Sequence, residues 1–148
     1  MQPAVPPIPG EIYRHGRFYR DDEGIWQPKF LLVLAFSPGR DIVYRLLTSE
    51  PHGRSTTPPC HHGDPYPGYF LDVPGGPLTR QTWLDLRAAD DYDDGHFAEH
   101  VSEGWLQLAL SLPLAQVCEA LSCAARAEDT TNQQARAMLD QRAIMGCP

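Results

Sequence analysis

Proline and glycine are unevenly distributed along this chain of 148 residues, and their distribution limits the folds that it can adopt. Most of the 15 prolines and 12 glycines precede residue 80, whereas none lies between Pro113 and Gly146. Both residue types interrupt regular elements, so the first part is predicted to consist of short strands joined by turns and the last part of helices. Strands followed by helices are typical of an α+β fold.

Size and charge narrow the choice further. A mass of 16.5 kDa suits one domain with one core. The net charge of −7 opposes non-specific binding to nucleic acid or to an anionic membrane, unless basic side chains are segregated. The longest apolar run, residues 30–36, is far shorter than the roughly 18–20 residues of a membrane-spanning helix. We therefore expect a soluble protein without membrane contact.

The N-terminus and the cysteines indicate a cytoplasmic protein. The first ten residues contain four prolines and no basic stretch, so residues 1–9 are predicted to be a flexible segment and not a targeting peptide. The four cysteines have no zinc-ribbon or redox-motif spacing. They are Cys60, Cys118, Cys123 and Cys147. We expect them to be reduced, with Cys118 and Cys123 as small buried hydrophobic residues of one helix.

Apolar patterns predict the individual strands. Residues 11–14 and 17–20 flank His15-Gly16, which favours a two-residue hairpin turn. The apolar run 29–36 predicts a strand buried on both faces, and residues 41–48 should pair with it in antiparallel orientation. Further strands are expected at residues 69–73, 78–86 and 105–112.

Helical signals dominate after residue 112. Leu114, Val117 and Leu121 fall on one face of a helix that runs to about residue 127. Thr130 with Gln133 predicts a capping box for a second helix, which Gly146 should end. We therefore expect a small, strongly bent antiparallel sheet at residues 10–112 and a helical extension at residues 113–148 that packs on it.

Four short segments resemble, in the same order, the MazF/PemK-type toxin superfamily. They are residues 10–13, 28–34, 46–49 and 78–86. The resemblance implies an SH3-like barrel, a homodimer, and cleavage of single-stranded RNA without a metal or other cofactor. Thr48 and Ser49 match a Thr-Ser pair that the family places near the cleaved phosphate, and Lys29 falls beside its catalytic arginine. The family has an Arg-Pro pair where this chain has Pro28-Lys29.

RNA cleavage by the 2′-hydroxyl group needs a base, an acid and positive charge near the phosphate. The loop after Thr48 contains His52 and Arg54, and histidine titrates near neutrality. Candidate catalytic residues are Lys29, Thr48, Ser49, His52 and Arg54. The alternative is that the loop histidines are only polar surface residues.

Aromatic and basic residues alternate near the N-terminus, a pattern that can stack bases and bind phosphates. Candidate RNA-binding residues are Arg14, Arg17, Tyr19, His61 and His62. The faces of strands produce the same alternation, so a structural role is the alternative.

Cys60, His61 and His62 with Asp64 offer zinc ligands, but adjacent side chains rarely converge on one ion. We therefore expect no metal site, and a zinc-dependent function remains a third alternative.

Two functions follow from these observations. The first is a cytoplasmic, toxin-like endoribonuclease, whose partners would be RNA and a protein antitoxin. The second is a catalytically inactive barrel that acts as a protein-binding or assembly module through its added helices. The net negative charge and the lysine in place of arginine favour the second function.

Overall fold

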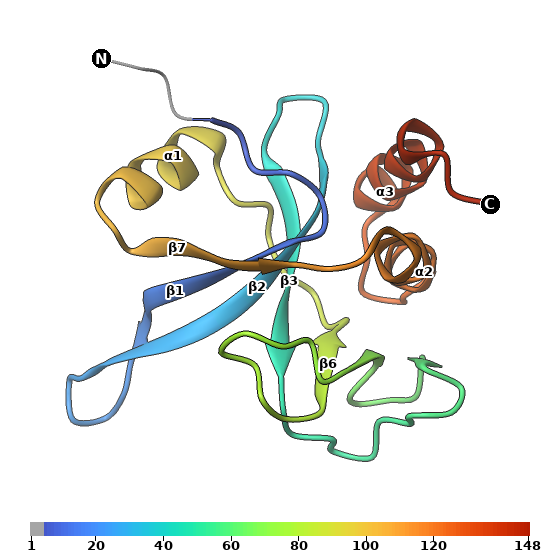
Figure 1. Cartoon of the computed structure of the whole chain (residues 1–148), viewed down its shortest axis with the longest axis horizontal. Coiled ribbons are helices and arrows are strands. Elements are labelled where there is room, and N and C mark those ends of the chain that lie inside the picture. Colours follow the sequence, from blue (N-terminus) through green and yellow to red (C-terminus); the bar gives the residue numbers. More distant parts are fainter. Residues whose placement is uncertain (1–4) are drawn as a thin grey trace.

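The structure, a computed structural model, describes residues 5–148. Seven strands form one antiparallel sheet in the order β4-β5-β6-β3-β2-β1-β7, and three helices pack around it (Figure 1). The strands are β1 (Glu11–Arg20), β2 (Trp26–Phe36), β3 (Ile42–Thr48), β4 (Cys60–His61), β5 (Gly68–Asp72), β6 (Thr82–Asp85) and β7 (Leu106–Ser111). The helices are α1 (Asp94–Ser102), α2 (Leu114–Ala125) and α3 (Asn132–Met145). The predicted α+β class is confirmed.

The sheet is open in the described part of the chain. Strands β4 and β7 form its two edges and do not pair with each other, so these pairings make a twisted sheet and not a closed barrel.

The prediction of a flexible segment at residues 1–9 falls partly on residues 1–4, which lie outside the described residues. None of the helices within residues 5–148 has the length and apolar character of a membrane-spanning segment.

Strand β2 is buried on both faces, as predicted. Its side chains alternate across the sheet, so Leu32 and Leu34 join the larger core cluster with α2 and α3. Leu31 and Val33 point the other way and pack with Phe97 of α1. One continuous apolar run therefore supplies both cores. The predicted antiparallel pairing of β2 with β3 is also confirmed.

The predicted hairpin turn at His15-Gly16 is wrong. Strand β1 continues through both residues, with an irregularity in its pairing between His15 and Tyr19. The turn lies further on, because the Asp21 carboxylate accepts the backbone N–H groups of Glu23 and Ile25, each at 2.9 Å. Gly24 completes this turn with φ of +77°, which glycine adopts without strain.

The capping box of α3 lies one residue later than predicted. The Thr131 hydroxyl accepts the backbone N–H of Gln134 at 3.1 Å, and the Gln134 side chain accepts that of Thr131. Thr130 instead donates to the Ala124 carbonyl at 2.7 Å. Gly146 ends the helix in the left-handed region, as expected.

The cysteines differ from the prediction of unpaired thiols. Cys118 and Cys123 are buried in α2, as expected, but each is half of a disulfide bond. Cys123 pairs with Cys60 of β4, and Cys118 pairs with Cys147 near the C-terminus. Five residues rotate a helix by about 140° beyond one turn, so the two cysteines meet different neighbours. Tertiary packing determines the partner of each cysteine, and the spacing of cysteines in the sequence does not show it.

Candidate functional site

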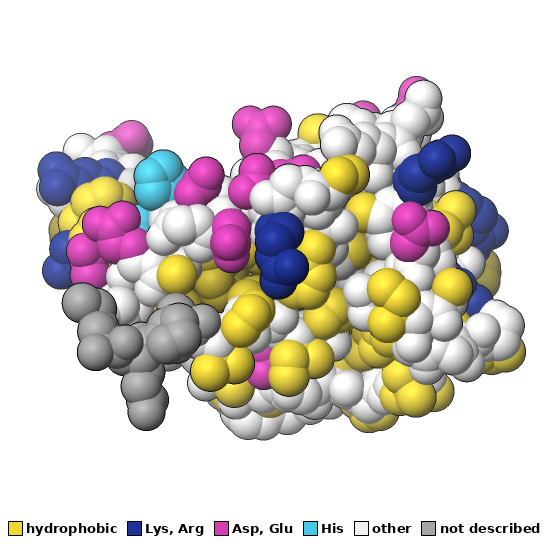
Figure 2. Space-filling view, turned by 90° about the horizontal axis from the view of Figure 1, so that it is seen from above, with side chains coloured by type: hydrophobic (Ala, Val, Ile, Leu, Met, Phe, Trp, Pro, Cys, Tyr) yellow, Lys and Arg dark blue, Asp and Glu magenta, His cyan; other side chains and the backbone are white. Residues whose placement is uncertain are grey.

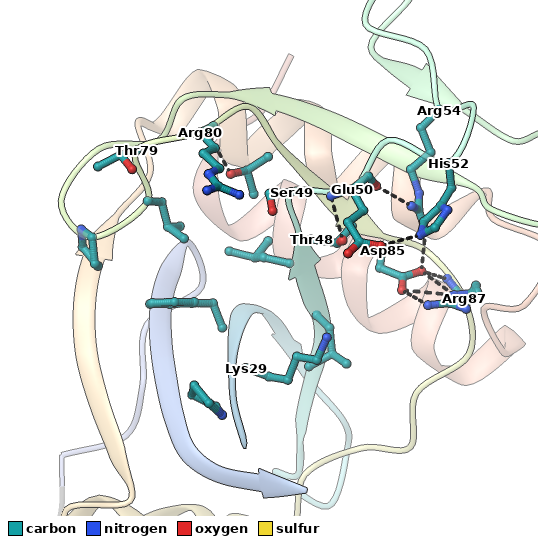
Figure 3. A pocket seen from close by; sticks show the side chains of 17 residues that line it. Lys29, Thr48, Ser49, Glu50, His52, Arg54, Thr79, Arg80, Asp85 and Arg87 are labelled. Atoms are coloured by element: carbon teal, nitrogen blue, oxygen red, sulfur yellow. Dashed lines mark hydrogen bonds and ion pairs between the residues drawn. The ribbon is translucent and has the colours of Figure 1, made fainter. Parts of the chain in front are cut away.

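A cavity of about 510 Å³ opens where β2, β3 and β6 meet the segments that follow β3 and precede β6 (Figure 3). Its volume falls in the usual range for ligand-binding sites. All five predicted catalytic residues line it: Lys29, Thr48, Ser49, His52 and Arg54. The fold thus brings Lys29 of β2 to the same cavity as the end of β3.

Positive charge exceeds negative charge around this cavity. The lining contains Lys29, Arg54, Arg80 and Arg87 against the two carboxylates of Glu50 and Asp85. The cavity therefore carries local positive charge, although the whole chain has a net charge of −7. Figure 2 shows a face on which acidic and basic side chains are both scattered among hydrophobic ones. The segregation of basic side chains makes the cavity suitable for an anion.

A tight turn positions His52 at the cavity. The backbone N–H of Arg54 donates to the Pro51 carbonyl at 2.7 Å. His52 and Gly53 have φ of +45° and +81°, the signs of a turn with two left-handed central residues. The turn is anchored at Thr48, whose hydroxyl accepts the backbone N–H of Glu50 at 3.1 Å.

The His52 imidazole is oriented by two neighbours. Its Nε2 lies 2.8 Å from Oε2 of Glu50, and its ring stacks on Tyr66 with centroids 4.6 Å apart. A carboxylate on one ring nitrogen fixes the tautomer and leaves the other nitrogen, Nδ1, to exchange a proton with a substrate. Glu50 was not among the predicted residues, although it stands two positions before His52.

Arg54 is held beneath this turn and is almost wholly buried. Its Nε donates to the Pro67 carbonyl at 3.0 Å and its Nη1 to the Glu50 carbonyl at 3.1 Å. A Cβ on Gly68 would lie 2.4 Å from Arg54 Cδ, so the absence of a side chain there makes room for the arginine. Arg54 thereby ties the turn that carries Glu50 and His52 to the start of β5.

Asp85 of β6 balances the charge of Arg54. Its carboxylate lies 3.3 Å from Arg54 Nη2 and accepts hydrogen bonds from Nε and Nη2 of Arg87. Burial acts to raise the pKa of Asp85, but hydrogen bonds from the side chain and backbone of Arg87 and the positive charges of Arg87 and Arg54 prevail and lower the pKa below its usual value. Asp85 is therefore ionised at neutral pH.

The lowered pKa of Asp85 predicts that stability falls in acid. A carboxylate with a depressed pKa in the folded state stabilises the fold above its unfolded pKa, 3.8 here, and this contribution is lost as pH falls through the lower folded value. Urea unfolding at pH 7 and at pH 3 measures the loss. Asp85→Asn should show a smaller difference between the two pH values than the wild type, and an equal difference would contradict this assignment.

Two cations at the cavity have no ion-pair partner among residues 5–148. Lys29 is half-buried on β2, and Arg80 is exposed just before β6. Figure 3 places Arg80 on the opposite side of the cavity from His52 and Arg87. Sequence analysis missed Arg80, although it lies in the last of the segments that resemble the toxin family.

The predicted RNA-binding residues lie away from this cavity. Arg14, Arg17 and Tyr19 belong to β1, and the Arg17 guanidinium lies 4.9 Å from the centre of the Trp105 ring. His61 and His62 lie at the β4 edge of the sheet. None of the five lines the cavity.

Comparison with known proteins gives no match to a protein-family model, to a curated protein or to a solved structure.

Proposed function

We propose that this protein is a metal-independent endoribonuclease of the MazF/PemK type that cleaves single-stranded RNA. The observation that carries the proposal is the cavity itself, where hydroxyl groups, a carboxylate-bound histidine and unpaired cations lie together. These are the groups that phosphodiester cleavage by an internal hydroxyl requires. An SH3-like arrangement of the open sheet, a homodimer, a cytoplasmic location and an antitoxin partner belong to the same proposal.

The cavity residues divide the chemistry between them. His52 takes the proton of the RNA 2′-hydroxyl, whose oxygen forms a bond to phosphorus while the bond from phosphorus to the 5′-oxygen breaks. A water molecule donates a proton to the 5′-oxygen, and the products are a 2′,3′-cyclic phosphate and a 5′-hydroxyl. Thr48 and Ser49 donate hydrogen bonds to the phosphate, and Lys29 and Arg80 stabilise its growing negative charge. Arg54, which is buried, positions the turn.

Incubation of purified protein with mixed single-stranded RNA and EDTA tests the proposal. We expect cleavage that EDTA does not inhibit and that a 2′-deoxy nucleotide at the cut site abolishes. The Lys29→Ala and Thr48→Ala variants should cleave more slowly, because each removes a group at the phosphate. Uncut RNA, or cleavage that neither variant affects, would exclude this activity.

The β1–β2 hairpin favours the alternative, a protein-binding module. The hairpin projects away from α2 and α3 (Figure 1) and exposes Tyr19, Ile25 and Trp26. Exposed apolar groups of this size on one element are typical of a protein contact. If RNA stays uncut, pull-down from a native lysate with wild-type protein and with Ile25→Asp should decide. A partner retained equally by both would count against docking at the hairpin.

A further inference from the structure

The Cys60–Cys123 disulfide bond lies beside an imidazole. His62 Nε2 is 3.1 Å from Cys60 Sγ and 4.0 Å from Cys123 Sγ. The donor atoms of these three side chains all lie within 4.8 Å of one another. Within residues 5–148, no other group of three or more Cys, His, Asp or Glu residues brings its donor atoms together in this way. Two of the three side chains come from the β4 edge, and the third comes from α2.

The nitrogen-to-sulfur distances in this group lie close to those of a zinc site. Zinc bonds of about 2.3 Å to sulfur and 2.0–2.1 Å to nitrogen place tetrahedral ligands roughly 3.5–3.8 Å apart. The two His62-to-sulfur distances, 3.1 and 4.0 Å, lie on either side of that range. The largest change that zinc binding requires is separation of the two sulfur atoms, which are bonded to each other in the disulfide.

The surroundings suit a thiolate-bound metal with one open position. Nη2 of Arg126 lies 3.7 Å from Cys60 Sγ, so its N–H can hydrogen-bond a metal-bound thiolate. Cys123 is buried, Cys60 is half-buried and His62 is exposed, which leaves a path for the ion and for a water molecule. Three protein ligands with a fourth position for water is an established zinc arrangement.

The geometry points to a zinc site formed by Cys60, His62 and Cys123 when their disulfide is reduced. A dithiol supplies two electrons and two protons, is itself oxidised to a disulfide, and converts the Cys60–Cys123 bond to two thiols. Binding of Zn²⁺ then releases both thiol protons. The zinc site and the disulfide are mutually exclusive, and each joins the β4 segment to α2.

Zinc titration of the full-length chain tests this inference. After reduction by a phosphine and removal of the reductant, competition with a chromogenic chelator should report one Zn²⁺ per chain, and the oxidised protein should bind none at this site. His62→Ala should weaken binding by more than about tenfold, which is the lower bound for the loss of even an outer partner of a metal site. His61→Ala, which removes the adjacent imidazole, should bind as the wild type does.

A second measurement uses the wild-type protein alone and so does not depend on a variant that folds. Zn²⁺ should slow the alkylation of half-buried Cys60 in the reduced chain relative to the zinc-free chain, while the alkylation of half-buried Cys147 stays unchanged. The Cys118→Ser/Cys147→Ser variant should keep the zinc stoichiometry. Absence of bound zinc, alkylation of Cys60 that Zn²⁺ does not slow, or unchanged affinity in His62→Ala would overturn the inference. None of these readouts involves RNA, so the result is independent of the proposed nuclease activity.

Discussion

His52→Asn is expected to lower the rate of RNA cleavage by about 10²–10⁴-fold, the usual contribution of a general acid or base. Asparagine tolerates positive φ better than most residues, so it can keep the turn in which His52 has φ of +45°. It cannot take up the proton of the 2′-hydroxyl. Cleavage of a fluorescently labelled RNA under single-turnover conditions measures the effect on the chemical step.

The matched control is His61→Asn. His61 lies on β4 and does not line the cavity, so this variant should cleave RNA at the wild-type rate. Glu50→Gln should cause a smaller loss than His52→Asn, because Glu50 acts only by orienting the imidazole through the contact of 2.8 Å. A wild-type rate in His52→Asn, together with slow cleavage in Lys29→Ala, would place the proton transfer on another residue.

Asp85→Ala is expected to destabilise the fold by about 3–5 kcal/mol, the typical cost of removing one partner of a buried ion pair. The Arg54 side chain is 1% exposed and that of Asp85 is 9% exposed. Without Asp85, the Arg54 charge would remain buried with only carbonyl groups and the Tyr66 ring beside it. Urea unfolding at pH 7 measures the change in the free energy of unfolding.

Two further variants show whether Asp85→Ala destabilises the fold because it leaves a buried charge unpaired or because it removes a carboxylate. Asp22→Ala removes an exposed carboxylate from the β1–β2 turn and should change stability little. The double variant Arg54→Met/Asp85→Leu should be more stable than Asp85→Ala, because it removes both charges and leaves apolar side chains in their place. A loss below about 1 kcal/mol in Asp85→Ala, the size of a surface ion pair, would show that Arg54 is solvated.

Local sequence signals predicted much of the fold. Apolar periodicity located β2 and β3, because a strand between two layers must be apolar on both faces. Gly146 marked the end of α3, since the left-handed terminal residue of a helix favours glycine. The hairpin prediction failed because a stronger local signal lay nearby. The Asp21 carboxylate accepts two backbone N–H groups of the turn, whereas His15 Nδ1 accepts only that of Arg17.

The sequence by itself determined which residues would be buried in the strands and which would end the helices, because those properties depend on neighbours a few positions away. Only the tertiary structure decided which buried groups meet. Arg45, fully buried on β3, donates to the Gln134 side chain of α3 at 2.9 Å. Arg54 meets Asp85, and Cys60 meets Cys123. Such pairs depend on the order of the strands and on how the helices pack on the sheet, which no local pattern encodes.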